Sequence, residues 1–246
     1  YCYSGDRAFL DRMYPQVRAA LKFLQELRER RDTPEYRDDP EKQVFHNILP
    51  ESRSHEGYWL AHSYWDSFWA LKGWKDGVAI AKEMEKSEDA GWMQREYESL
   101  KGGVYGTIAR VMRKFGIDYI PGCAELGDFD ATSTAAALVF CDELPNMPQP
   151  QTSNTFERYY RELASRFQPD AQYVFTPYEV RNTLALLFLG QKQRALDLVH
   201  FLLDCRRPPG WQHLAEVVHS GYRFPCYIGD MPHTWVGACF INAIRG

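Results

Sequence analysis

The sequence lacks long hydrophobic runs, an excess of basic residues and closely spaced cysteine pairs. Its 246 residues contain no uninterrupted apolar stretch of the about 18 residues that a membrane-spanning helix requires, so no segment is predicted to cross a membrane. Lys and Arg number 29 against 33 Asp and Glu, which gives a net charge of −4. A nucleic-acid-binding surface needs a basic excess that releases counterions, so a nucleic-acid partner is not expected.

The six cysteines form no CxxC pair and no short Cys/His spacing. Zinc sites and disulfide frameworks both depend on such patterns, so neither is predicted, and we expect no metal or other cofactor. Cys141 and Cys239 lie in apolar helical runs and are expected to be small buried side chains. This cysteine usage favours a reducing compartment such as the cytoplasm. The sequence starts at Tyr1 and shows no signal-like segment before Ser4, which predicts a processed chain or a fragment.

Aromatic residues are abundant: they make up 15 % of the chain, with seven Trp and fifteen Tyr. Large aromatic side chains usually fill a core, and we interpret most of them in this way. Several, however, stand beside Gly, Pro, Asp and His in loops. Aromatic rings in loops suit flat ligands rich in hydroxyl groups, such as sugars, and for the clusters described below we favour this second interpretation.

Apolar residues recur at three- and four-residue steps almost throughout, which predicts an all-α protein. Helices with one charged face alternate with apolar helices that we expect to be surrounded by protein. The four charged-face segments are 4–31, 87–116, 153–167 and 191–207, with Ser4 and Ser87 as candidate N-caps. The four apolar segments are 62–86, 131–144, 178–190 and 233–246.

Long loops precede the apolar segments, whereas the other turns are short, which predicts helical hairpins with all long loops at one end. A closed ring of six hairpins needs about twelve helices and roughly 350 residues. This chain supplies about eight helices. We therefore expect residues 1–246 to form a single α/α-toroid domain that is open or lacks its N-terminal hairpins, as the C-terminal part of a larger catalytic domain would.

Four loops carry the candidate site residues. The first places Glu56 before Tyr64, Trp65 and Asp66, which begin an apolar helix. The positive end of that helix would keep Asp66 ionised and ready to accept hydrogen bonds from hydroxyl groups. The alternative interpretation is purely structural: Asp66 starts the helix, and the neighbouring aromatic side chains belong to the core.

In the third loop, Thr176, Pro177 and Glu179 form a complete helix-start signature. Glu179 is therefore either part of a cap or a sugar contact, with equal support for each. In the fourth loop, Trp211 precedes Glu216, a carboxylate in apolar surroundings.

The last apolar segment of the chain begins near Asp230. Asp230 is a candidate cap for this helix. His233 and Trp235 follow it, and we expect both side chains to face the pocket.

The segment YWDSFW resembles the YWDSYW core of the trehalase signature, and similar strings occur in the six-hairpin glycosidases, which have the (α/α)6 toroid. The resemblance implies that Trp65 and Asp66 contact substrate. The second loop contains the segment ELGDFDATS (residues 125–133). This segment is similar to the ESGWD segment that carries the general acid in those enzymes, and the resemblance implies that Asp128 is the acid. Asp130 is the alternative acid, or else the cap of the next helix.

The loop PPGW, which ends at Trp211, loosely resembles the loop that closes the trehalase pocket. The strings HxYWDxFW, GDFDATST, TPYEVRN and GDMPHTWVG extend the resemblance to bacterial members of the six-hairpin class, which does not fix a substrate. The glycine-rich PGGRF element is absent, and residues 53–58 stand in its place, which puts trehalose itself in doubt.

These residues predict an inverting glycoside hydrolase that acts on a carbohydrate without a metal. Asp128, or Asp130, would protonate the leaving oxygen and Glu216 would activate water. Glu56, Asp66 and Glu179 would bind hydroxyl groups, and His233 would face the same pocket. Its walls would be Tyr64, Trp65, Trp211 and Trp235.

Two other classes stay open. A sugar epimerase or polysaccharide lyase would use a His, Tyr or Arg for proton abstraction, and the histidines at positions 55, 62, 213, 219 and 233 provide candidates. A non-catalytic carbohydrate-binding or scaffold piece would expose the edges of its inner helices, which would drive homo-oligomerisation.

Overall fold

The computed structural model describes residues 4–54, 59–206, 210–221 and 229–245. This part of the chain is mostly helical, at 63 %, which confirms the all-α prediction. Its α-helices are α1 (Arg7–Glu29), α2 (Pro34–Asp38), α3 (Tyr64–Glu83), α4 (Ser87–Phe115), α5 (Ala131–Val139), α6 (Gln151–Ser165), α7 (Arg181–Phe188), α8 (Lys192–Asp204) and α9 (Thr234–Arg245). Two short strands, β1 (Val174–Phe175) and β2 (Val218–His219), pair antiparallel.

The chain divides into two compact units, where the sequence predicts one domain. Unit 1 comprises residues 1–117, 121–128 and 140–142. Unit 2 comprises residues 118–120, 129–139 and 143–246. Each unit has its own buried apolar core.

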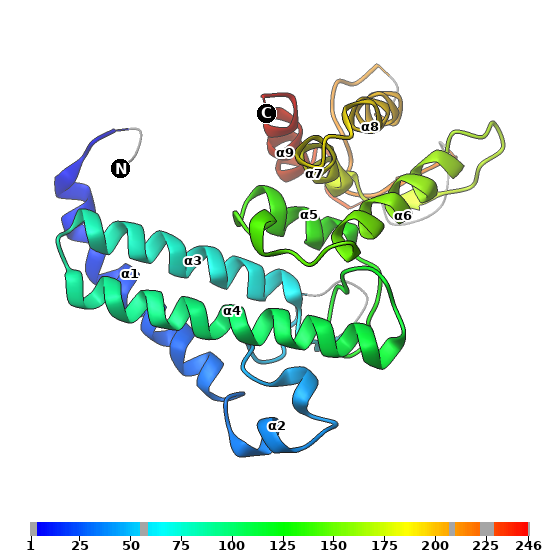
Figure 1. Cartoon of the computed structure of the whole chain (residues 1–246). Helices are drawn as coiled ribbons and strands as arrows, with labels where there is room; N and C mark the ends of the chain where they lie inside the picture. Colours follow the sequence, from blue (N-terminus) through cyan, green and yellow to red (C-terminus); the bar gives the residue numbers. More distant parts are fainter. Residues whose placement is uncertain (1–3, 55–58, 207–209, 222–228, 246) are drawn as a thin grey trace. The chain divides into compact units, whose positions relative to one another are not determined.

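Unit 1 is built on α3 and α4, which run side by side along most of their length as a hairpin, and α1 packs against them (Figure 1). Their contact faces carry buried aromatic and aliphatic side chains such as Phe68, Trp74 and Leu100. Helix α1 is capped by Asp6, whose carboxylate accepts a hydrogen bond from the backbone N–H of Phe9 at 2.9 Å. The prediction that Ser4 caps this helix is therefore wrong.

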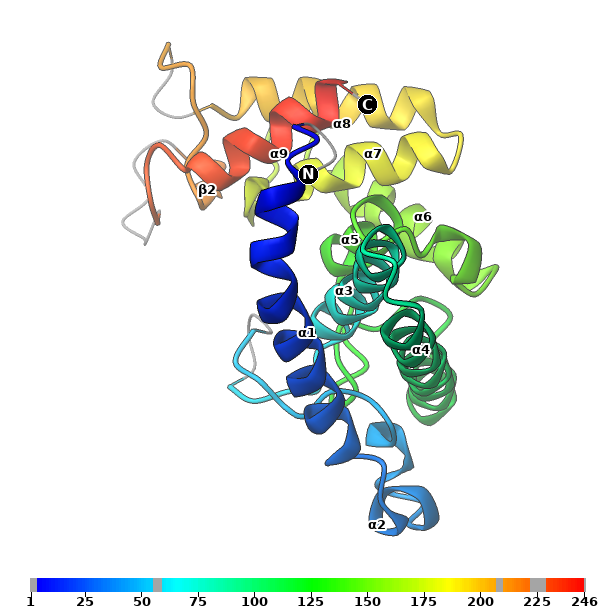
Figure 2. The same cartoon turned by 90° about the vertical axis from the view of Figure 1, so that its left-hand side faces the viewer.

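Unit 2 contains α5 to α9 and the β1–β2 pair. Figure 2 shows α7 and α8 lying together and joined by a short turn, as the sequence predicts for residues 189–191. Gly190 adopts φ 75° in this turn, a left-handed conformation that favours glycine.

The apolar helices of unit 2 are not all buried. Most side chains of α5 and α7 are buried, as predicted, because small residues and leucines occur around their whole circumference. In α9, however, only Val236, Cys239 and Ala243 are buried among its described side chains, and Trp235, Ile241 and Ile244 are more than half exposed. The expectation that α9 is surrounded by protein does not hold. In the described part of the chain, no helix has both the length and the apolar composition needed to cross a bilayer.

Candidate functional site

Asp66 lies in the first turn of α3. Its Oδ2 atom accepts hydrogen bonds from the hydroxyl groups of Ser52 at 2.5 Å and Ser54 at 2.7 Å. Ser52 is held by an antiparallel bridge to Ala61, which brings the loop before α3 back across the start of the helix. The carboxylate is thus oriented by hydroxyl groups from a segment that ends twelve residues before it.

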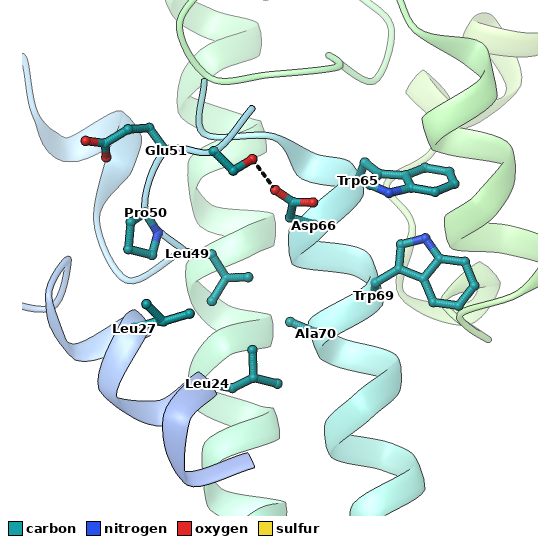
Figure 3. Close-up of a pocket in the computed structure, with 10 residues that line it drawn as sticks. Leu24, Leu27, Leu49, Pro50, Glu51, Trp65, Asp66, Trp69 and Ala70 are labelled. Carbon is teal, nitrogen blue, oxygen red and sulfur yellow. Dashed lines mark hydrogen bonds between the residues drawn. The ribbon is translucent and has the colours of Figure 1, made fainter. Parts of the chain in front are cut away.

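A cavity of about 510 Å³ opens beside Asp66. Helix α3 forms its floor, with leucines of α1 and the loop after Leu49 on one side and two indoles on the other (Figure 3). This volume is within the range of sites for small organic ligands. The lining residues all belong to unit 1 and are Leu24, Leu27, Leu49, Pro50, Glu51, Ser52, Trp65, Asp66, Trp69 and Ala70.

The two indoles are successive side chains on one face of α3. The rings of Trp65 and Trp69 meet edge to face, with centroids 5.7 Å apart, and Phe140 stacks on Trp69 at 6.1 Å. Trp69 is 40 % exposed, so much of its surface is open to a ligand. Tyr64 differs: it is fully buried and its hydroxyl group donates to Thr107 at 3.2 Å, so Tyr64 is a core residue and not a cavity wall.

A chain of polar contacts reaches this cavity from inside unit 1. The Glu125 carboxylate accepts a hydrogen bond from the backbone N–H of His62 at 2.9 Å and contacts its Nδ1 atom at 2.6 Å. Arg31 donates from Nε to His62 Nε2 at 3.1 Å, so Nδ1 must carry the proton that Glu125 accepts. Arg31 also pairs with Glu51, a lining residue of the cavity.

Glu51 was not predicted from the sequence, because only the fold brings Arg31 to it. Its own backbone N–H lowers the pKa of the Glu51 carboxyl, and Arg31 lowers it further against the opposing effect of burial. Both influences favour the ionised carboxylate.

The loop that carries Asp128 runs beside the start of α3. The backbone N–H of Tyr64 donates to the Gly122 carbonyl at 3.0 Å, and that of Ala124 donates to the His62 carbonyl at 3.1 Å. Asp128 closes this loop, since its Oδ1 accepts the backbone N–H of Cys123 at 3.1 Å. The structure therefore brings the predicted acid and Asp66 to neighbouring segments of unit 1.

Asp130 belongs to unit 2, where it precedes α5. Its Oδ1 accepts the backbone N–H of Ser133 at 2.9 Å, and its Oδ2 accepts the Ser133 hydroxyl group. This is the geometry of a helix N-cap, the alternative that the sequence leaves open for Asp130.

Glu216 is held in unit 2 by the segment that leads into α9. The backbone N–H of Asp230 donates to Glu216 Oε2 at 3.1 Å, and the backbone N–H of Glu216 donates to the Asp230 carbonyl at 3.1 Å. A Cβ atom at Gly229, which has φ 66°, would overlap the Glu216 carboxylate. Asp230 is not the cap of α9, which begins at Thr234; its backbone pairs with Glu216 instead.

Glu216, Asp230 and His233 are a group that could hold a metal ion. Each offers one ligand atom, and these atoms lie within 4.8 Å of one another. The Asp230 side chain is 83 % exposed, and exposed acidic groups of this kind are common without a metal.

His233 and Trp235 gather around Tyr178. The Tyr178 hydroxyl group lies 2.5 Å from His233 Nε2, and the rings of Tyr178 and Trp235 meet edge to face at 5.3 Å. The Arg181 guanidinium lies over the Tyr178 ring at 4.8 Å. These residues form a second aromatic and polar cluster, which is wholly within unit 2.

Glu179 does not join that cluster. Arg166 binds its two carboxylate oxygens at 2.8 and 3.0 Å, and the Tyr159 hydroxyl group donates to it at 2.8 Å. Burial, together with the nearby Glu179 charge, raises the pKa of Tyr159 well above its ordinary value, so the hydroxyl group keeps its proton. Glu179 is thus neither a cap nor placed for a sugar; Thr176 accepts the capping hydrogen bond, from Tyr178.

Trp211 and Glu56 are the two remaining predicted contacts. Trp211 is 60 % exposed, and its ring meets His213 edge to face at 5.5 Å. Glu56 lies outside the described residues. Unit 1 therefore groups Trp65, Asp66 and the Asp128 loop, while unit 2 groups Glu216 with His233 and its aromatic neighbours.

Comparison with known protein families, with curated proteins and with solved structures finds no match to this chain.

Proposed function

We propose that the chain is a glycoside hydrolase of the inverting type, built as a toroid of helical hairpins. The observation that carries this proposal is the Asp66 cavity, which combines an oriented carboxylate with two indoles. Carboxylates accept hydrogen bonds from sugar hydroxyl groups, and indole faces pack on the C–H faces of pyranose rings. The resemblance of YWDSFW to six-hairpin glycosidases points to the same residues.

Asp128 is the proposed general acid, because its loop lies beside the start of α3. Glu216 is the proposed base that activates water. Inverting enzymes in general hold their acid and their base roughly 6.5–9.5 Å apart, so that a water molecule fits between base and substrate. Asp66 binds hydroxyl groups of the sugar, and Trp65 and Trp69 support its ring.

The test is hydrolysis of a panel of nitrophenyl glycosides and disaccharides by the whole chain and its variants. We expect Asp128→Asn and Glu216→Gln each to lower kcat by about 10²–10⁴-fold, since each removes one proton-transfer group. Asp76→Asn on α3 and Glu162→Gln on α6 are matched controls, because each carboxylate forms an exposed ion pair four residues away on its own helix, with Lys72 and Arg158 respectively. Unchanged turnover in both active-site variants, with product of the same anomeric configuration, would reject the assignment.

A second candidate, a sugar epimerase or polysaccharide lyase, is favoured by one contact. The Tyr178 hydroxyl group and His233 Nε2 are close enough to exchange a proton, and Arg181 lies over the Tyr178 ring. His62 is less suited to such a role because Arg31 and Glu125 occupy its two nitrogens. Product analysis separates the candidates: hydrolysis leaves a new reducing end, a lyase leaves an unsaturated sugar, and an epimerase cuts no bond. Loss of turnover in Tyr178→Phe but not in Glu216→Gln would favour this second candidate.

A further inference from the structure

The charges that line the Asp66 cavity are of one sign. Among the residues that the structure describes, its lining includes two carboxylates, Glu51 and Asp66, and no Lys, Arg or His. We infer that this cavity selects a sugar that carries a protonated amino group, that is, an amino sugar, over neutral and acidic sugars. The inference rests on the proposed function in one respect, namely that the ligand is a sugar.

The Glu51 charge is already compensated. Arg31, whose side chain is 14 % exposed, pairs with the Glu51 carboxylate and is itself held by His62. Figure 3 shows the Glu51 carboxylate turned away from Asp66. The charges of the Glu51 carboxylate and the Arg31 guanidinium therefore cancel at this side of the cavity.

The Asp66 charge has no such partner. Ser52 and Ser54 both donate to Oδ2, and neither of these hydroxyl groups carries a charge. Among the residues that the structure describes, no Lys, Arg or His forms an ion pair with Asp66, and the other oxygen, Oδ1, receives no hydrogen bond from them. Asp66 thus gives the cavity a net negative charge and has an oxygen available for a ligand.

The rest of the lining strengthens this charge. The aliphatic side chains of Leu24, Leu27 and Leu49 lower the local dielectric constant, so an ion pair formed with Asp66 is stronger than one in open water. The faces of Trp65 and Trp69 attract cations through their ring quadrupoles. A ligand carboxylate or phosphate would meet the Asp66 charge, and no cation among the described lining residues would offset it.

The experiment measures binding of four methyl glycosides by titration calorimetry, with the tryptophan fluorescence of the cavity as a second readout. The probes are those of glucosamine, N-acetylglucosamine, glucose and glucuronic acid, at a pH where the amino group is protonated. We expect the glucosamine derivative to bind about tenfold more tightly than the glucose derivative, the size of effect given by one hydrogen bond to a charged group. The N-acetylated probe, which has the same nitrogen without the charge, should lose this advantage, and the glucuronic acid derivative should bind most weakly.

Asp66→Asn should abolish the preference for the amino sugar, whereas Asp76→Asn on the same helix should preserve it. Equal or tighter binding of the glucose derivative by the unaltered protein would overturn the inference, as would a preference that survives Asp66→Asn. Absence of binding by all four probes would also overturn it.

The inference and the proposed function can fail separately. Hydrolysis of neutral glycosides without any preference for amino sugars would leave the proposed function standing and overturn the inference. Selective binding of the glucosamine derivative without turnover of any glycoside would support the inference and overturn the proposed function.

Discussion

At the scale of single residues, the contacts of each carboxylate separate candidate chemistry from structural support. Glu179 and Asp66 both stand near the start of a helix. The fold gives Glu179 an arginine and a tyrosine, whereas it gives Asp66 two serine hydroxyl groups and an open cavity. Arg166 binds both carboxylate oxygens of Glu179, so neither oxygen is open to a ligand.

Glu179→Gln is therefore expected to destabilise unit 2 by about 3 kcal/mol, because it leaves the Arg166 charge buried without its partner. Denaturant unfolding followed by circular dichroism measures the change. The matched control is Glu162→Gln, which breaks an exposed pair with Arg158 on α6 and should cost less than about 1 kcal/mol. A Glu179 variant as stable as the control would show that the buried pair contributes little.

At the scale of elements, helix ends distinguish the two aspartates of the GDFD segment. Asp130→Ala should destabilise the protein by about 1 kcal/mol, because α5 loses its N-cap, and Asp130→Ser should restore most of this loss. Thermal unfolding of the three proteins measures both effects. Under the proposed function, Asp130→Ser should also keep its hydrolytic activity, and a serine variant that is stable but inactive would return the acid role to Asp130.

Helix α1 contacts α4 through the Asp89 carboxylate, and we expect the strength of this contact to depend on pH. The Tyr14 hydroxyl group donates to Asp89 at 2.6 Å, and Arg18 pairs with the same carboxylate at 3.0 Å. The Tyr14 hydrogen bond is the largest effect that lowers the pKa of Asp89, and burial opposes it. Since this pKa is lower in the folded protein, the contact stabilises the fold above the unfolded value of about 3.9 and loses its contribution as pH falls through the folded value.

Asp89→Asn should accordingly reduce stability at neutral pH and flatten the loss of stability on acidification below about pH 4. Unfolding curves recorded along a pH series provide the measurement. Tyr14→Phe, which removes the hydroxyl group alone, should raise the Asp89 pKa toward its ordinary value. If both variants lose stability below about pH 4 as steeply as the unaltered protein, this account is wrong.

The elements themselves were largely predictable. All eight predicted helical segments contain a helix, because their apolar spacing and the turns between them are local properties of the sequence. The short helix α2 was missed, since residues 34–38 are mostly charged and have no buried side chain. The exposed face of α9 was not predictable either, because apolar composition does not reveal whether a neighbour is present to cover it.

At the scale of the whole molecule, the two units and the predicted single domain make different predictions for unfolding. The toroid proposal joins all hairpins into one cooperative domain, so we expect a single calorimetric transition. Leu100→Ala in unit 1 and Leu163→Ala in unit 2 each empty a fully buried position, which costs about 2–5 kcal/mol. In a single domain, both variants should shift the same transition.

Two transitions, each moved by the substitution in its own unit, would show instead that the units unfold independently. The exposed variant Phe23→Ala on α1 serves as a control, because it should leave every transition near its original temperature.

The site was predictable only in part. Trp65 and Asp66 were found because they are adjacent in a short motif, and the cavity contains both. The partners that orient the carboxylates were not found: Arg31 precedes Glu51 by 20 residues, and Glu125 follows His62 by 63. Pairings over such separations follow from chain topology, which local spacing does not encode.

The location of the cavity has a consequence for redesign of the protein. Every lining residue of the Asp66 cavity belongs to unit 1, while the proposed base, Glu216, belongs to unit 2. Substitutions that retune ligand choice in this cavity and substitutions around the proposed base therefore fall on different parts of the chain. A laboratory evolution campaign could screen a library restricted to residues 49–54 and 65–70 for altered selectivity while leaving the surroundings of Glu216 untouched.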